Sequence, residues 1–171
     1  MTNRHSLDAL TRIALLSSLC VVLRYAFAAF PNIKPITALF LICCVVLNFS
    51  EGLLIMTISM LVSSFLFGFG PWVIWQIISF TVIMLLWRYL LYPITKSLLL
   101  SDKFLLFLQA FIAGLLSILY GMTSDTIYAF IYQIPWWTYV LAGASFNLLH
   151  AVSTAIFYSL LMPILKEVFS K

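Results

Sequence analysis

The chain has 171 residues, of which 64% are hydrophobic and 8% are charged, and its formal net charge is +4. A soluble domain is roughly 25% charged because its surface faces water, so this composition excludes an ordinary soluble fold. Stretches 52–87, 104–124 and 126–165 contain no Asp, Glu, Lys or Arg, and each exceeds the ~18 apolar residues that predict a membrane-spanning helix. Because the stretches lack the alternating pattern of a transmembrane barrel strand, the sequence predicts an all-α integral membrane protein.

Turn and helix-breaking residues divide the first half of the chain into three predicted helices. The prolines of segment 31–35 cannot continue a helix, the polar segment 50–52 is typical of a tight turn, and the segment 68–71, Gly-Phe-Gly-Pro, breaks the apolar run. No small-residue cleavage site follows the polar residues 1–8, so we expect the first apolar helix to be retained and not to be a signal peptide. The three helices are predicted at 7–30, 36–49 and 52–67.

Three further helices are predicted in the second half, at 72–91, 104–122 and 138–165. The charged residues of segment 93–103 predict a solvent-exposed loop. Segment 123–137, which contains Asp125 and Pro135, is also predicted as a loop. The complete prediction is a single transmembrane domain, 1–171, built as a bundle of six membrane-spanning helices.

Basic residues are distributed unequally between the two ends of this predicted bundle. Seven lie on the side of the termini and two lie on the opposite side. Cytoplasmic segments of membrane proteins are enriched in Lys and Arg, so we expect both termini in the cytoplasm of a bacterial cell and the domain in its plasma membrane. Because the bases are scattered at the ends of apolar runs, they do not predict nucleic-acid binding. The seven are Arg4, Arg12, Arg88, Lys96, Lys103, Lys166 and Lys171, and the two are Arg24 and Lys34.

The sequence contains no motif typical of an enzyme or a metal centre. Neither a glycine-rich phosphate loop nor a His-Glu-x-x-His pattern is present. Ser145 and His150 could suggest an intramembrane serine protease. They are separated by about 140° around a helix, however, so they do not face each other. The cysteines at positions 20, 43 and 44 lack metal-ligand spacing and are predicted as core residues. We expect no catalytic residue, no metal and no intrinsic cofactor.

The predicted positions of two acidic residues bear on ion-coupled transport. Ion-coupled carriers place Asp, Glu or His within the membrane to bind protons or cations. Glu51 and Asp125 are both predicted in turns, which leaves the spans without acids. Transport against a gradient would then need energy from another subunit.

Aromatic and hydrogen-bonding side chains are concentrated at the predicted outer ends of the helices. Such side chains around a concavity suit a flat, polar-edged small molecule. The alternative is that the Trp and Tyr residues belong to the aromatic belts found at the membrane interface of most membrane proteins. Arg24 is more informative, because a cation below the interface is costly unless it pairs or snorkels. The candidate substrate-binding residues are Arg24, Tyr25, Asn32, Lys34, Trp72, Trp75, Gln76, Tyr128, Trp136, Asn147 and His150.

Small residues spaced four apart occur in three predicted helices and allow another helix to approach closely. The first helix has Ala14 and Ser18, with Ser17 beside them. The other two motifs are Ala110-x-x-x-Gly114 and Ala151-x-x-x-Ala155. Each motif can pack inside the bundle or against a partner protein.

Over essentially its whole length the chain resembles the substrate-binding S components of energy-coupling factor (ECF) vitamin transporters. The shared features are six short helices, termini predicted inside, no energy source and a small-residue face on the first helix. Two segments are similar to a cobalamin-type subgroup of these proteins. They are Pro31-Asn32-Ile33-Lys34-Pro35-Ile36-Thr37 and Phe67-Gly68-Phe69-Gly70-Pro71-Trp72-Val73-Ile74-Trp75-Gln76.

The resemblance implies a subunit that captures a vitamin from outside and topples in the membrane when it docks on a transmembrane scaffold subunit carrying two cytoplasmic ATPases. ATP is then used by the partner subunits only. The resemblance also implies that outer loops one, three and five line the pocket. It implies that Ala14 and Ser18 contact the scaffold together with Ser17, with Ser18 in place of the family's second alanine.

Cobalamin is the substrate that the resemblance favours, and riboflavin, pantothenate, a pyrimidine precursor or queuosine are alternatives. A small self-contained carrier or channel that works as a homo-oligomer is the alternative function. A membrane enzyme that depends on His150 and an assembly factor that transports nothing are two further alternatives.

Overall fold

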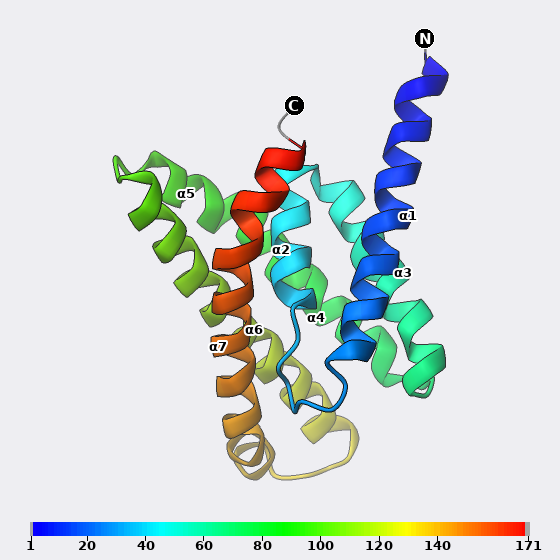
Figure 1. The fold of residues 1–171 in the computed structure, drawn as a ribbon. Helices are drawn as coiled ribbons and strands as arrows, with labels where there is room; N and C mark the ends of the chain where they lie inside the picture. The colour runs from blue at the N-terminus through cyan, green and yellow to red at the C-terminus, as the bar shows by residue number, and fades with distance from the viewer. Residues whose placement is uncertain (1, 170–171) are drawn as a thin grey trace.

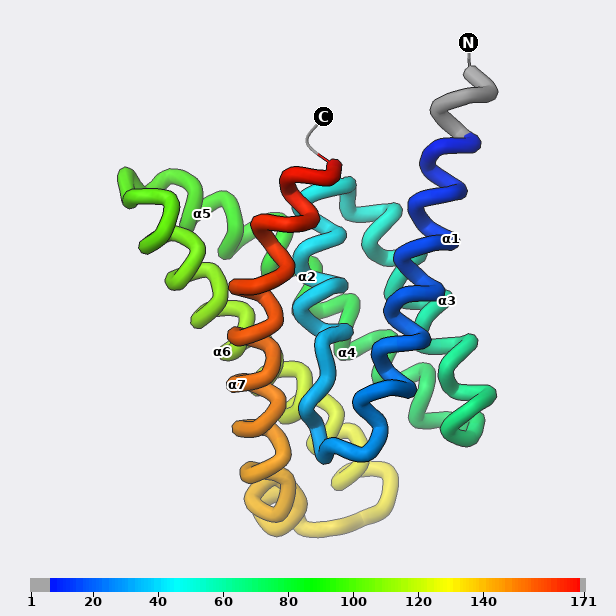
Figure 2. Tube along the Cα trace, viewed as in Figure 1, coloured from blue at the N-terminus to red at the C-terminus, as the bar shows by residue number. Residues whose placement is uncertain are grey.

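The computed structural model describes the backbone of residues 2–169 and the side chains of residues 7–169, and this part of the chain is entirely helical outside its turns. The chain runs back and forth, so that both ends lie at the same end of the bundle (Figures 1 and 2). We call this the terminal end and the opposite one the distal end. The elements are α1 (Thr2–Ala26), α2 (Ile36–Val46), α3 (Phe49–Phe67), α4 (Trp72–Leu86), the π-helical turn η1 (Trp87–Leu91), α5 (Tyr92–Ser97), α6 (Asp102–Ile131) and α7 (Trp136–Phe169).

Within the described residues, five helical segments are long and apolar enough to cross a membrane. The predicted second span is different, because α2 has only 11 residues. At 1.5 Å per residue it measures about 16 Å, against a hydrocarbon core of about 30 Å. The five long segments are Leu7–Ala26, Phe49–Phe67, Trp72–Ser97, Asp102–Ile131 and Trp136–Phe169.

The short helix α2 forms the core of the bundle. All nine of its residues from Ile36 to Cys44 are buried, and α1, α3, α4, α6 and α7 all contact it. A helix that is apolar on every side is stable only when it is surrounded in this way. At Gly52 of α3 an added Cβ would lie 2.8 Å from the Cys44 backbone, so this glycine lets α3 approach α2 closely. The three cysteines are buried, as predicted.

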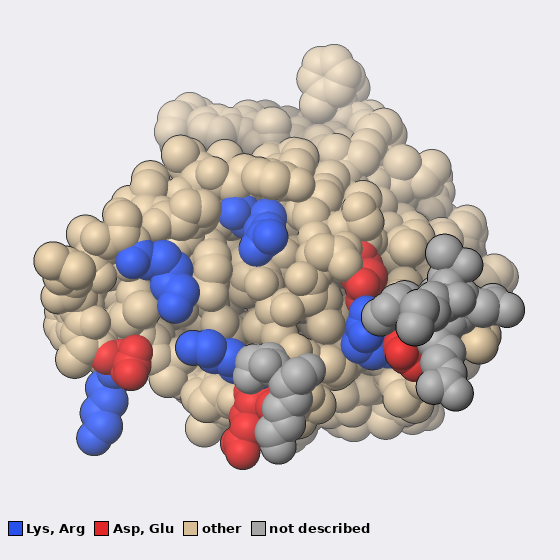
Figure 3. Space-filling model, turned by 90° about the horizontal axis from the view of Figure 1, so that it is seen from above, with Lys and Arg blue, Asp and Glu red and all other residues tan. Residues whose placement is uncertain are grey.

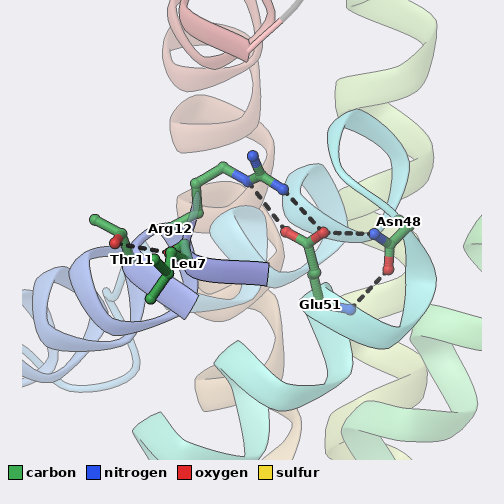
Figure 4. Close-up of polar contacts among 5 residues, drawn as sticks. All are labelled: Leu7, Thr11, Arg12, Asn48 and Glu51. Atoms are coloured by element: carbon green, nitrogen blue, oxygen red, sulfur yellow. Dashed lines mark hydrogen bonds and ion pairs between the residues drawn. The ribbon is translucent and has the colours of Figure 1, made fainter. Parts of the chain in front are cut away.

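The turn between α2 and α3 is tied to α1 by a polar cluster (Figure 4). Asn48 caps α3: its Oδ1 accepts a hydrogen bond from the Glu51 backbone N–H (2.9 Å), and its Nδ2 donates to Glu51 Oε1 (2.7 Å). Arg12 of α1 donates from Nε and Nη2 to the same carboxylate at 3.2 Å and 3.1 Å. Because the cap is Asn48, α3 begins at Phe49 and not at 52 as predicted.

Two predicted loops are partly helical. Helix continues from α4 through η1 and α5 to Ser97, because the π-helical turn, in which the Tyr92 N–H donates to Trp87 O, accommodates Pro93. Helix α6 continues nine residues beyond the predicted end at 122, up to Ile131. The Thr126 hydroxyl donates to Met122 O (2.7 Å) and so fits inside the helix. The loop before α7 is therefore only 132–135.

The chain between α1 and α2 folds back against α7. Helix α1 ends at Ala26, four residues earlier than predicted, and α2 ends at Val46. In the connecting segment the Asn32 Nδ2 donates to Phe146 O, and the Lys34 N–H donates to Ser153 Oγ, both at 3.0 Å. We call residues 27–35 the return loop. It brings polar groups to the distal half of the bundle.

Charged side chains gather at the terminal end, as the view onto that face shows (Figure 3). Among the described side chains, Arg24 and Lys34 are the only bases in the distal half. The side chain of Arg4 and all of Lys171 lie outside the described residues. The bases of the terminal half are Arg12, Arg88, Lys96, Lys103 and Lys166.

Candidate functional site

A small cavity lies in the distal half of the bundle, where the return loop leads into α2. Its volume is about 80 Å³, which is enough for several water molecules. We call it the distal cavity. Residues from the return loop and from α1, α2, α3, α4, α6 and α7 contribute to it, so nearly every element of the fold is needed to form it. Its lining residues are Arg24, Asn32, Lys34, Ile36, Thr37, Met60, Gln76, Phe80, Tyr120 and His150.

Two cations of the distal cavity have only neutral partners. The Arg24 Nη1 donates to Ser63 Oγ of α3, and its Cζ lies 5.4 Å from the centroid of the Phe67 ring. The Lys34 Nζ lies 5.9 Å from the same centroid. Among the described side chains the only ion pair is that of Arg12 with Glu51. Burial, and then the nearby Arg24 cation, lower the pKa of Lys34 from its ordinary value. The cavity therefore carries positive charge that no carboxylate among residues 7–169 neutralises by an ion pair.

The N-terminus of α2 adds to this positive potential. Ile36 and Thr37, the first two residues of α2, line the cavity, and no side chain caps the helix there. The first N–H groups of a helix have no partner within the helix, and they lie at the positive end of its dipole. Helix N-termini bind oxyanions for this reason.

Aromatic rings form one wall of the distal cavity. Phe80 and Tyr120 stack with their centroids 4.0 Å apart, and His150 meets Tyr120 edge to face at 5.6 Å. The His150 Nε2 also shares a hydrogen bond of 2.8 Å with Thr37 Oγ1. Both of these groups are buried, so the bond fixes α7 against the start of α2.

Gln76 supplies a buried acceptor that has no partner. It lies in the second turn of α4, and its Oε1 is buried without a hydrogen bond to any described residue. An unsatisfied buried polar group costs about 1–3 kcal/mol. Because Gln76 lines the cavity, a hydrogen-bond donor that enters the cavity can satisfy this oxygen.

The structure brings together five of the eleven predicted substrate-binding residues and separates the other six. Arg24, Asn32, Lys34, Gln76 and His150 line the distal cavity. The six that do not line it are Tyr25, Trp72, Trp75, Tyr128, Trp136 and Asn147.

Local packing accounts for several of these six side chains. Tyr25 is exposed and lies near Phe67, with ring centroids 6.2 Å apart. The Tyr128 ring stacks on those of Tyr132 and Tyr139, and the Trp136 Nε1 donates to Thr126 Oγ1 (2.9 Å). The contacts of Tyr128 and Trp136 hold the distal ends of α6 and α7 together.

Sequence reasoning missed five of the lining residues: Ile36, Met60, Phe80, Thr37 and Tyr120. The first three are apolar side chains within apolar helices, so nothing in the sequence separates them from core residues. Thr37 and Tyr120 carry hydroxyl groups inside long charge-free runs, which is a usable but weak signal.

Asn147 pairs with Asp125, and this pair corrects one prediction. The Asn147 Nδ2 donates to Asp125 Oδ2 at 2.9 Å. Asp125 was predicted in a turn, but it lies within α6, six residues before the end of that helix. The spans are therefore not free of acids, and the argument against an ion-coupled carrier loses this support.

Glycines make room for the Asp125–Asn147 pair. An added Cβ would lie 2.0 Å from Asn147 Oδ1 at Gly121 of α6, and 2.7 Å from Asp125 Oδ2 at Gly143 of α7. Each polar side chain therefore occupies the space that a Cβ on the opposite helix would fill. The close packing of α6 and α7 depends on both glycines.

The small-residue motif of α1 faces away from the bundle. Ala14 and Ser18 are exposed, whereas Ser17 is buried beneath them and its carbonyl accepts a hydrogen bond of 3.4 Å from Ser59 Oγ. We call the hollow of about 440 Å³ at this place the α1–α3 groove. Its lining residues are Leu10, Ile13, Ala14, Ser17, Ser18, Val21, Val22, Ile58 and Val62.

The other two small-residue motifs pack inside the bundle. An added Cβ at Gly114 would lie 3.0 Å from Ala151 O and 3.5 Å from the Ala155 Cβ, so these motifs join α6 to α7. Of the three motifs, the one on α1 is therefore left open to a partner.

Comparisons with protein-family models, with curated proteins and with solved structures gave no match to this chain. Among the described residues, no three His, Cys, Asp or Glu side chains are grouped so that they could hold a metal ion. The distal cavity and the α1–α3 groove are the two features that bear on function.

Proposed function

We propose that this chain is the substrate-binding membrane subunit of an importer of the ECF type. It captures a vitamin or related small molecule outside the cell and depends on a transmembrane scaffold subunit and two cytoplasmic ATPases to release it inside. The observation that carries the proposal is the distal cavity, where two cations, a helix N-terminus and an unpaired Gln76 oxygen converge. Placed polar groups that converge on a cavity are typical of ligand sites, and most of the residues that line this cavity are polar.

The distribution of charge supports an outward-facing cavity. Five of the bases with described side chains lie in the terminal half and two lie in the distal half. Cytoplasmic ends of membrane proteins carry the excess of Lys and Arg, so the proposal has both termini inside and the distal cavity near the outer surface.

The α1–α3 groove supports a partner within the membrane. In lipid, helices associate mainly through close van der Waals packing at small residues. Ala14 and Ser18 offer such a surface, with Val21, Val22 and Val62 around it. In the proposal the scaffold subunit packs one of its helices against this groove.

Separate subunits for capture and for energy also follow from the magnitude of tight binding. A nanomolar ligand is held by about 12 kcal/mol. Release inside the cell then requires a state with much weaker affinity, and a ligand or partner can shift the chain to that state only by binding it preferentially. In the proposal the scaffold binds the low-affinity state of the chain preferentially. ATP hydrolysis by the ATPases then returns the chain to its high-affinity state.

The volume of the distal cavity limits the size of the group that it can enclose. About 80 Å³ is well below the roughly 300–1,000 Å³ of sites that enclose a drug-sized ligand. In this conformation the cavity holds a small molecule or one end group of a larger one. Cobalamin, the lead substrate, would enter only if the return loop and the distal helix ends separated, whereas the smaller alternatives require less movement.

One observation favours a second candidate, a self-contained carrier that works as a homo-oligomer. Asp125 and Asn147 form a half-buried polar pair between α6 and α7, and membrane-embedded acids are typical of proton or cation coupling. The pair does not line the distal cavity, so the capture site and the acid are separate. For this reason the importer subunit remains the better-supported proposal.

Co-expression with a scaffold and two ATPases of the ECF type tests the proposal. The tagged chain should co-purify with all three subunits. Vesicles containing this complex should take up the substrate only when ATP is enclosed on the side of the membrane that carries the ATPases. A chain that fails to associate with any such scaffold, yet transports in its absence, would contradict the proposal.

A further inference from the structure

We infer that the solute presents to the distal cavity a compact oxyanion, a carboxylate or a phosphate, with a hydrogen-bond donor beside it. The inference rests on the proposed function only in taking the distal cavity as the capture site. It narrows the substrate class by the charge and hydrogen bonding of the group that enters.

The two cations of the distal cavity carry unbalanced charge. Arg24 and Lys34 lie beside the same aromatic ring, Phe67, and their remaining contacts are with neutral groups. Among the described acids, only Glu51 forms an ion pair, and its partner is Arg12 at the terminal end. Two like charges in partly buried positions repel strongly because the local dielectric constant is low. An anion between them would remove this repulsion and make charge-assisted hydrogen bonds with both.

Helix α2 begins at the distal cavity. Its first turn lines the cavity at Ile36 and Thr37 and lacks a side-chain cap. Cations and an uncapped helix N-terminus are independent sources of positive potential, and here they act on one cavity. Both favour an oxyanion over a neutral ligand.

Gln76 indicates that the solute carries a hydrogen-bond donor. The Gln76 Oε1 is a buried acceptor with no partner, whereas Thr37 and His150 satisfy each other. A bare anion offers no proton to Gln76. A ligand with an N–H or O–H group next to its oxyanion satisfies both the cations and this amide, and the stacked rings of Phe80 and Tyr120 contact its carbon skeleton.

Two matched pairs of probes test the inference on the unmodified chain. Orotate is compared with its neutral carboxamide, and pantothenate is compared with pantothenol, by titration calorimetry of the chain in nanodiscs without other anions. Each acid should bind at least about tenfold more tightly than its neutral counterpart, as expected for the loss of a charge-assisted hydrogen bond. Neutral probes that bind as tightly as the acids, or acids that do not bind at all, would overturn the inference.

Variants then identify the groups responsible. Arg24→Met and Lys34→Met should each weaken acid binding by about tenfold or more and leave the neutral probes unaffected. Lys103→Met removes an exposed lysine of the terminal end and serves as the control. Gln76→Leu should weaken orotate, which has N–H donors, and leave sulfate, an oxyanion that carries no proton at neutral pH, unchanged. Equal effects of Gln76→Leu on both probes would overturn the assignment of the donor.

The inference and the proposed function fail in different experiments. ATP-dependent uptake of riboflavin by the assembled complex, with no competition from orotate, pantothenate or phosphate, would overturn the oxyanion inference and leave the importer proposal intact. Preferential binding of the acids by a chain that transports without partner subunits would overturn the importer proposal and leave the oxyanion inference intact.

Discussion

Arg24 and Lys34 approach one aromatic ring: the guanidinium carbon of Arg24 lies 5.4 Å, and the ammonium nitrogen of Lys34 5.9 Å, from the centroid of Phe67. The two residues belong to different elements, because α1 ends at Ala26 and the return loop then folds back against α7. Each cation–π contact contributes only about 0.5–2 kcal/mol. The ring therefore does not replace an anion as the partner of these charges.

Binding of pantothenate should weaken as the pH rises through the pKa of Lys34. Burial and then the Arg24 cation lower this pKa from its ordinary value of 10.5, so the weakening should begin below that pH. A bound carboxylate stabilises the protonated amine and raises its pKa, so binding takes up protons and is favoured at lower pH. Titration calorimetry over the alkaline range measures the trend. In Lys34→Met the trend should disappear, and a wild-type profile as flat as that of this variant would contradict the assignment.

The Thr37–His150 hydrogen bond should stabilise the bundle. His150→Ala leaves the Thr37 hydroxyl buried without a partner, and Thr37→Val does the same to His150 Nε2, at a cost of about 1–3 kcal/mol each. The double variant should cost less than the sum of the two because both remove one interaction. Thermal unfolding in detergent measures this coupling, and additive losses would show that the two side chains act independently.

Gly121→Ala should destabilise the packing of α6 against α7 by about 1–3 kcal/mol. The new methyl group would lie 2.0 Å from Asn147 Oδ1, so Asn147 has to swing away and lose its bond to Asp125. Asn147→Ala removes the obstructing atoms, so the variant Gly121→Ala/Asn147→Ala should be no less stable than Asn147→Ala alone. If the double variant unfolded more readily than Asn147→Ala in the same thermal assay, a different clash would be responsible.

Ala14→Trp should block assembly with the scaffold and leave ligand binding intact. The indole would fill the α1–α3 groove, which Ala14 and Ser18 line, and the groove is separate from the distal cavity. Leu15→Trp is the matched control, because Leu15 is exposed on the same helix but does not line the groove. Co-purification with the scaffold and calorimetric binding of the probes are the two readouts. Loss of probe binding in Ala14→Trp, or equal loss of assembly in Leu15→Trp, would contradict the docking assignment.

Asp125→Asn separates the importer subunit from the ion-coupled carrier. Asn keeps the shape of Asp125 and can still hydrogen-bond Asn147, but it cannot bind a proton or cation as the carboxylate does. If energy comes from partner ATPases, ATP-driven uptake by the assembled complex should be nearly unchanged. Uptake that falls to background in correctly assembled Asp125→Asn would favour the carrier.

The sequence predicts the membrane class and most of the helix order, because long charge-free runs between proline and glycine clusters have few alternatives. It does not predict helix ends where packing decides them. Pro93 is typical of a break, but a π-helical turn accommodates it. Segment 123–131 has turn-forming residues, but pairing of Asp125 with Asn147 and threonine bonds to the preceding turn keep it helical.

The candidate site is predictable only where polar residues stand out from apolar sequence. Arg24, Lys34 and Gln76 meet that condition, and the structure brings them to one cavity. The interfacial tryptophans stand out equally but lie elsewhere, because aromatic residues also serve the membrane interface. Thr37 belongs to a helix that is buried on all sides, so hydrophobic periodicity cannot show which of its faces meets the cavity.

The most direct test of the account is accumulation by the chain alone. Proteoliposomes containing only this polypeptide, with proton and sodium gradients imposed in turn, are supplied with labelled pantothenate or orotate. The account predicts saturable binding that Arg24→Met weakens, and no accumulation above the external concentration under either gradient. Accumulation against the solute's own gradient would contradict the account, because the energy for it could then only come from an ion path within this chain.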